Sequence, residues 1–129
     1  MRLQLALNVR DLKEAVEYYS KLFDTKPHKL RDGYANFAID HPPLKLVLFE
    51  NPNAPERLNH LGVETFDASE VAAVAARLDA AGIAAEIQRN KTCCHATQNK
   101  VWSSEPQGLR WEWYQITDDN PAEPSKAVG

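Results

Sequence analysis

Two adjacent cysteines, Cys93 and Cys94, have the most distinctive chemistry of any residues in this chain. They are its only cysteines, and they lie in a largely polar segment, residues 92–98. Neighbouring Cα atoms are ~3.8 Å apart, which is below the ~4.4 Å at which the usual disulfide range begins. Two thiolates side by side are better suited to binding one thiophilic metal or metalloid. The pair therefore predicts a soft-ion site; the alternative is that both are small apolar residues inside the fold.

Gln4, His60 and Glu112 could form a second metal site, one that suits a harder ion. Each alternates with apolar neighbours along a strand-like segment, so each points away from the apolar face. For Gln4 these neighbours are Leu3 and Leu5, which we expect in the core. An imidazole, a carboxylate and an amide oxygen leave coordination positions open, as suits Fe(II), Mn(II) or another divalent ion. The alternative is that His60 is a hydrogen-bonded structural residue.

An internal repeat specifies the elements that carry these residues. Residues 4–11 and 60–67 each read as a strand that ends in an aspartate, with a glutamate three residues later, a variant of the helix capping box. Three strand-like segments follow each predicted helix, at about 27–31, 34–39 and 44–50 and at about 85–89, 98–103 and 109–116. The sequence therefore predicts an α+β fold of two βαβββ modules in tandem, repeat 1 at about 2–50 and repeat 2 at about 58–116. The modules would share one curved, largely antiparallel sheet.

The repeat also predicts where the candidate ligands meet. Gln4 and His60 occupy equivalent positions, so pseudo-twofold symmetry would bring them together in a metal-binding hollow at the centre of the sheet. Glu112 on the last strand would face the same hollow, whereas its repeat partner Val47 supplies no ligand. The second repeat is the longer one, and its extra length can be placed around residues 90–97. The cysteine pair would then lie on an insertion beside the hollow.

Composition limits the classes of function. The chain has 129 residues, enough for one domain, which we place at residues 1–116 with a flexible tail at 117–129. A formal net charge of -3 argues against nucleic-acid binding, which usually needs a basic face. The N-terminal segment lacks a signal-peptide pattern, and no stretch is apolar enough to span a membrane. We therefore expect a cytoplasmic protein whose two thiols stay reduced.

These segments together resemble the vicinal oxygen chelate superfamily, which holds glyoxalases, bleomycin-resistance proteins and extradiol dioxygenases. Within it the chain is most similar to ArsI-type carbon–arsenic lyases and cadmium-induced proteins. The resemblance covers roughly residues 2–116. The matching stretches are QLALNV at 4–9, YYSKLF at 18–23, GYANFAI at 33–39, PPLKLVL at 42–48, LNHLGVE at 58–64, TCC at 92–94, QNKVW at 98–102 and WE at 111–112.

The resemblance implies a nonheme Fe(II) held by His60 and Glu112, and a trivalent organoarsenical bound by Cys93 and Cys94 on a mobile loop. It implies that dioxygen is used to break the carbon–arsenic bond of species such as methylarsenite, with release of inorganic arsenite, and that the protein is a homodimer. Gln4 departs from the lyase pattern, which has a histidine as first ligand. A neutral amide oxygen would hold iron less tightly, although glyoxalase-type relatives use glutamine there.

Two other functions remain open. The cysteine pair could sequester Cd(II) or As(III) without turnover, a reading that Gln4 favours. The fold could instead carry glyoxalase-like isomerisation or another dioxygenation, against which the cysteine pair argues because such chemistry needs no soft-ion ligand. Lys100 could contact an anionic intermediate or lie exposed, and exposure is favoured. Trp102 and Tyr114 could line the hollow but are expected in the core.

Overall fold

The computed structural model describes residues 1–93 and 96–121 of the chain. Each half contains one strand, one helix and three further strands, so the predicted tandem of βαβββ modules is confirmed. The elements of the first module are β1 (Arg2–Val9), α1 (Leu12–Leu22), β2 (Lys29–Arg31), β3 (Tyr34–Ile39) and β4 (Leu44–Glu50). Those of the second are β5 (Leu58–Glu64), α2 (Ala68–Ala80), β6 (Glu86–Cys93), β7 (Ala96–Ser104) and β8 (Arg110–Asp118).

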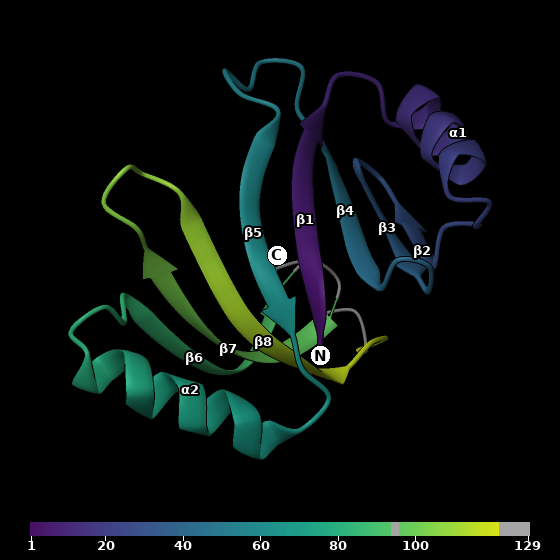
Figure 1. Ribbon diagram of the computed structural model, residues 1–129. Coiled ribbons are helices and arrows are strands. Elements are labelled where there is room, and N and C mark those ends of the chain that lie inside the picture. The colour runs from purple at the N-terminus through teal and green to yellow at the C-terminus, as the bar shows by residue number, and fades with distance from the viewer. Residues whose placement is uncertain (94–95, 122–129) are drawn as a thin grey trace, which may run out of the picture.

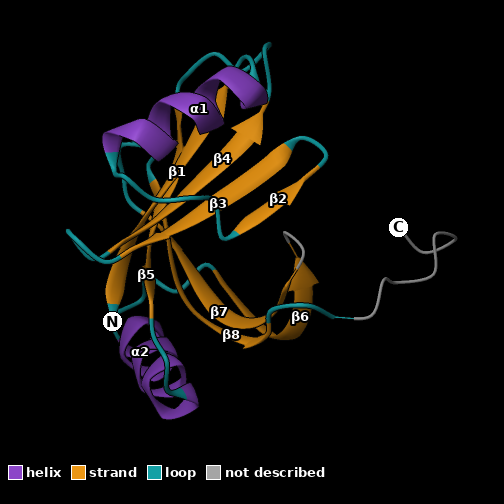
Figure 2. Ribbon diagram, turned by 90° about the vertical axis from the view of Figure 1, so that its right-hand side faces the viewer, coloured by secondary structure: helices purple, strands orange, loops and turns teal. Residues whose placement is uncertain are grey.

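The eight strands form one sheet in the order β2-β3-β4-β1-β5-β8-β7-β6. The pairs β1–β4 and β5–β8 are parallel, and the other strand pairs of the described chain are antiparallel. The two modules meet where β1 pairs with β5, at the middle of the sheet (Figure 1). The sheet curls so that both helices lie on its convex side (Figure 2). Its concave side is therefore left to form a hollow.

The helices begin where the sequence predicts. The side chain of Asp11 accepts a hydrogen bond from the backbone nitrogen of Glu14 at 3.1 Å, as in a capping box. Asp67 caps α2 differently, because its side chain accepts from the backbone nitrogen of Ser69 at 2.9 Å. Glu70 instead accepts a hydrogen bond from the hydroxyl of Thr65, which precedes the helix.

The apolar core lies between the sheet and the helices. In the first module it is centred on the strand residues Ala35, Phe37, Leu46 and Leu48. The expectation that Leu3 belongs to the core is wrong, since it is 58% exposed. The first-module core lies against β3, β4 and the far end of β1, which leaves the start of β1 uncovered on the convex side. The buried face of β1 at this point is the polar one, which carries Gln4.

Two predicted boundaries differ from those in the structure. The described residues of the segment around 90–97 belong to strands, because β6 extends to Cys93, β7 begins at Ala96, and the two strands pair there. β8 continues to Asp118, beyond the predicted domain end at 116, and Asp119 forms an ion pair with Lys29 on β2. The start of the predicted tail thus belongs to the fold, and residues 122–129 lie outside the described part. Neither helix of the described chain is long and apolar enough to cross a membrane.

Candidate metal centre

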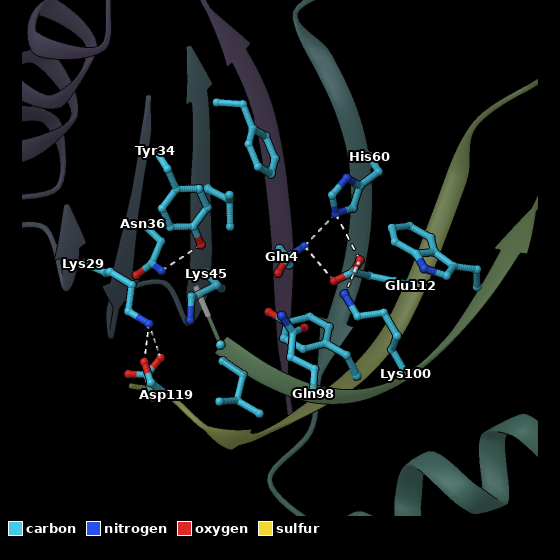
Figure 3. Close-up of a pocket in the computed structure, with 16 residues that line it drawn as sticks. Gln4, Lys29, Tyr34, Asn36, Lys45, His60, Gln98, Lys100, Glu112 and Asp119 are labelled. Atoms are coloured by element: carbon cyan, nitrogen blue, oxygen red, sulfur yellow. Dashed lines mark hydrogen bonds and ion pairs between the residues drawn. The ribbon is translucent and has the colours of Figure 1, made fainter. Parts of the chain in front are cut away.

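The concave face of the sheet forms a polar hollow with a cavity of about 60 Å³, room for a few water-sized groups. All the buried polar side chains of the described chain except Glu64 and Thr65 line it. Figure 3 shows that they form two groups, one around His60 and Glu112 and another around Lys29 and Lys45. Buried polar groups are costly unless they are partnered, so a hollow lined this way is built to hold something polar.

Gln4, His60 and Glu112 meet at the first end of the hollow, as the repeat predicts. The Nε2 atoms of Gln4 and His60 are 3.0 Å apart. Gln4 Nε2 lies 3.3 Å from Glu112 Oε1, and His60 Nε2 lies 3.3 Å from Glu112 Oε2. The three side chains come from β1, β5 and β8, which are adjacent in the sheet, and all three are buried.

A chain of hydrogen bonds fixes the tautomer of His60. The backbone carbonyl of Glu56 can only accept, so the Nδ2 of Asn8, 3.0 Å away, donates to it. The Oδ1 of Asn8 then accepts from Asn59 Nδ2 at 3.0 Å, which leaves Asn59 Oδ1 to accept from His60 Nδ1 at 2.7 Å. The proton of a neutral His60 is therefore on Nδ1, and the lone pair of Nε2 points into the hollow. This is the arrangement of a metal-ligating histidine with an outer hydrogen-bond partner.

Gly62 makes the close approach of these strands feasible. It lies on β5 opposite Gln4 on one side and Glu112 on the other. A Cβ at this position would be 2.9 Å from Glu112 Cγ, 3.0 Å from the Glu112 carbonyl oxygen and 3.4 Å from Gln4 Nε2. Carbon–carbon contacts are most favourable at about 3.5–4.0 Å. Only glycine therefore fits without displacing a candidate ligand.

Glu112 is held as a carboxylate by its neighbours. Burial by itself would raise its pKa, but the positive charge of Lys100 and the hydrogen bond donated by Gln4 Nε2 oppose this effect, and the pKa lies below its ordinary value. Lys100 Nζ lies 3.5 Å from Glu112 Oε2. The expectation that Lys100 is exposed is wrong, because it is only 2% exposed. Its ammonium is enclosed by the rings of Trp102 and Tyr114, whose centroids are 5.4 and 5.8 Å away.

The chemistry of the donor set fits a divalent metal. Neighbouring ligand atoms of an octahedral ion at about 2.1 Å lie about 3.0 Å apart, close to the separations of 3.0 and 3.3 Å found here. Gln4 presents nitrogen in this structure, and its amide would present oxygen after a half-turn. Only two of the three donors, those of His60 and Glu112, belong to the usual metal-ligating residue types, and the third is the amide of Gln4. Accordingly, the described residues contain no group of three His, Cys, Asp or Glu side chains that could hold a metal.

Two aromatic residues expected in the core line the hollow instead. The ring of Trp102 packs edge-on against His60 with centroids 5.1 Å apart. Tyr114, which is 2% exposed, has a hydroxyl with no hydrogen-bond partner among the described residues. Burial raises the pKa of this hydroxyl well above its ordinary value. Trp102 thus restricts the imidazole, and Tyr114 offers a polar atom to a ligand.

Only the first cysteine of the pair falls within the described residues. Cys93 is the last residue of β6 and pairs with Ala96, the first residue of β7. Cys94 and His95 fall outside the described residues. Ala96 is buried and lines the hollow, so the residue paired with Cys93 forms part of the wall of the site.

Sequence reasoning missed the second end of the hollow, which contains Lys29, Asn36, Lys45 and Asp119. Asp119 Oδ1 is 3.0 Å from Lys29 Nζ, and its Oδ2 is 2.6 Å from His28 Nε2. Partial burial would raise the pKa of Asp119, but these two partners outweigh it and lower the pKa. Strand alternation could have found Asn36 and Lys45, since both are polar residues in otherwise apolar strands.

Comparison with known proteins agrees with this geometry. Residues 3–113 match the family model of the Glyoxalase/Bleomycin resistance protein/Dioxygenase superfamily. The cadmium-induced protein CadI of Mycobacterium tuberculosis is 54% identical over 119 residues, 92% of this chain and 78% of that protein. The trivalent organoarsenical cleaving enzyme of Thermomonospora curvata is 50% identical over 119 residues, 92% of this chain and 79% of that enzyme. The resemblance expected from the sequence is thereby confirmed.

Solved structures share the fold. The Mn(II)-bound glyoxalase of Novosphingobium aromaticivorans superposes with a TM-score of 0.66 at 17% identity, over 95% of this chain and 41% of that chain. The methylmalonyl-CoA epimerase of Mycobacterium tuberculosis superposes with a TM-score of 0.59 at 18% identity, over 98% of this chain and 90% of that chain. At such identities the likeness concerns the fold alone.

Proposed function

This chain belongs to the glyoxalase/bleomycin resistance protein/dioxygenase superfamily, and we propose that it cleaves the carbon–arsenic bond of trivalent organoarsenicals, with dioxygen as the oxidant. The observation that carries the proposal is the meeting of Gln4, His60 and Glu112 in a hollow whose wall includes the residue paired with Cys93. The name of the Thermomonospora curvata relative, a trivalent organoarsenical cleaving enzyme, supports the substrate class.

His60 Nε2, a carboxylate oxygen of Glu112 and the amide oxygen of Gln4 would hold Fe(II). Fe(II) bound there would supply the activation of dioxygen. The protein contributes a carboxylate kept ionised beside Lys100 and an imidazole whose lone pair is directed inward by Asn59. Gln4 replaces the histidine of the lyase pattern, so we expect weaker iron binding than in proteins with that histidine.

Cys93 and Cys94 would bind the arsenic atom through sulfur, because thiolates select soft ions. A substrate fixed in this way would have its reacting bond held beside the metal, and such positioning can lower a barrier by several kcal/mol. Lys100, whose ammonium lies 3.5 Å from Glu112, would contact negative charge that develops there. Trp102 and Phe49 line the hollow with His60, and their ring centroids lie 5.1 and 6.5 Å from that of the imidazole.

A second candidate function is sequestration of Cd(II) or As(III) by the cysteine pair. The neutral donor Gln4 favours it, as does the 54% identity to proteins named cadmium-induced. In that case the metal centre would be structural or vestigial.

Two variants separate the candidates. Glu112→Ala should abolish arsenite release from methylarsenite in the Fe(II)-loaded protein while stoichiometric arsenical binding persists. The double variant Cys93→Ser, Cys94→Ser should lose arsenical binding and keep Fe(II) affinity. Arsenic speciation and metal titration provide the readouts. Equal arsenite release by Glu112→Ala and the unaltered protein would contradict the lyase proposal.

A further inference from the structure

Lys45 is a buried cation that lacks a hydrogen-bond acceptor among the described residues. Its side chain lines the hollow and is 3% exposed, on β4 directly opposite Gln4 of β1. Its nearest carboxylate oxygen is Glu64 Oε2 at 3.8 Å, which is beyond hydrogen-bond distance. Glu64 is moreover already in close contact with Arg2 through its other oxygen. An ammonium has three N–H donors, and burying them without hydrogen-bond acceptors costs free energy.

Other polar atoms in the same cavity also lack partners. The hydroxyl of Tyr114 and the Oδ1 atom of Asn36 have none among the described residues. Asn36 Nδ2 lies 3.0 Å from the hydroxyl of Tyr34, so the amide has one side engaged and the other facing the cavity. A turned amide would present a donor there instead. Figure 3 shows Lys45 between Gln4 and Asn36.

The charge balance of the hollow favours an anion. Lys29, Lys45 and Lys100 line it, against two carboxylates, Glu112 and Asp119. Each carboxylate is engaged by a lysine other than Lys45, since Lys100 faces Glu112 and Lys29 faces Asp119. A divalent metal at the first end would add further positive charge.

We propose that Lys45, together with the hydroxyl of Tyr114 and the amide of Asn36, forms an oxyanion subsite that binds a carboxylate on the organic group of the substrate. This assignment rests on the proposed function for the identity of the substrate, but the subsite itself does not depend on turnover. Lys45 and Gln4 lie on adjacent strands, which are about 4.8 Å apart. The subsite therefore adjoins the metal centre, and we expect it to accept a carboxylate joined to arsenic through a short carbon linker.

The first experiment measures binding of an arsenic-free probe. Propionate and its neutral analogue propionamide are titrated into the metal-free protein, and the amide side-chain signals of Asn36 and Gln4 are followed by NMR. We expect propionate to bind and propionamide to bind at least about tenfold more weakly, because hydrogen bonds to charged groups are the strong ones. Lys45→Met should weaken propionate binding by at least about tenfold. Lys13→Met, at an exposed position of α1, should leave it unchanged.

Tyr114→Phe provides a second variant that keeps the shape of the side chain, should Lys45→Met fail to fold. It removes one hydrogen bond to the charged carboxylate and should weaken propionate binding by at least about tenfold. No propionate binding by the unaltered protein, or equal binding by it and both variants, would overturn the subsite.

The second experiment compares two substrates. With methylarsenous and carboxymethylarsenous acid, the unaltered Fe(II)-loaded protein should favour the carboxylate by at least about tenfold in kcat/KM, and Lys45→Met should remove this preference. An unchanged preference in Lys45→Met would contradict the subsite. If neither compound is turned over, the result counts against the proposed function. If propionate does not bind, the result counts against the subsite. The two failures are therefore distinguishable.

Discussion

Gly62→Ala tests whether the packing of the central strands holds the metal ligands in place. The added Cβ would lie 2.9 Å from Glu112 Cγ and 3.0 Å from the Glu112 carbonyl oxygen. The carbonyl belongs to β8, which is paired with β5 at this point, so it cannot move alone. The strands must separate by roughly 0.5–1 Å to restore ordinary contact. Overpacking of this kind costs about 1–3 kcal/mol of unfolding free energy.

The same displacement moves Glu112 away from His60 and Gln4. Loss of ligand orientation typically lowers metal affinity about 10- to 100-fold. We therefore expect Gly62→Ala to bind Mn(II), used as an air-stable probe, about 10- to 100-fold more weakly than the unaltered protein. Urea denaturation measures the change in stability, and isothermal titration calorimetry measures the affinity.

Ala35→Gly is the matched control. It removes a methyl group from the core between the sheet and α1, away from the hollow, and should cost about 1–2 kcal/mol. It should bind Mn(II) as the unaltered protein does. If folded Gly62→Ala also binds Mn(II) with unaltered affinity, the claim that this glycine positions Glu112 is wrong.

Three further predictions concern the neighbours of the ligands. Asn59→Leu removes the acceptor that fixes the imidazole, so Mn(II) affinity should fall about 10- to 100-fold with little change in unfolding free energy, as calorimetry and urea denaturation will show. Lys100→Met removes a charge that lowers the pKa of Glu112, so on acidification Mn(II) binding should be lost at a higher pH than in the unaltered protein; identical pH profiles would contradict this. The pKa of Asp119 is lowered in the folded state, so its contribution to stability is present above the unfolded value of about 3.9 and is lost as the pH falls through the lower folded value. Asp119→Asn should therefore be less stable by at most about 1 kcal/mol at pH 7, because the pair is partly solvent-exposed, and the difference should vanish at acid pH.

The sequence was sufficient to predict the fold and the meeting of the three candidate ligands. A repeat with matching strands and helix caps places Gln4 and His60 in equivalent positions, and strand alternation assigns Glu112 to the same face. These patterns predict the structure reliably because a one-residue shift in strand register would move every side chain to the opposite face of the sheet. A sheet with one buried face does not tolerate such a shift. The prediction failed for Leu3, because the position of the helices on the convex face cannot be read from alternation alone.

The remaining parts of the site depend on three-dimensional contacts that no periodic sequence pattern specifies. The burial of Lys100 results from aromatic side chains on its own and the adjacent strand, Trp102 and Tyr114. The ion pair of Asp119 with Lys29 joins the end of β8 to β2, and no periodic pattern signals it. The roles of Gly62 and Asn59 follow only from distances to neighbouring atoms.

The central claim is that the metal centre and the cysteine pair act together to break a carbon–arsenic bond. The most direct measurement is arsenic speciation after the protein is reconstituted anaerobically with Fe(II), mixed with methylarsenite and then exposed to dioxygen. We predict that inorganic arsenite forms in excess over the protein, and only after dioxygen is admitted. Methylarsenite that stays bound in stoichiometric amount, with no arsenite released, would contradict the claim and leave sequestration as the function.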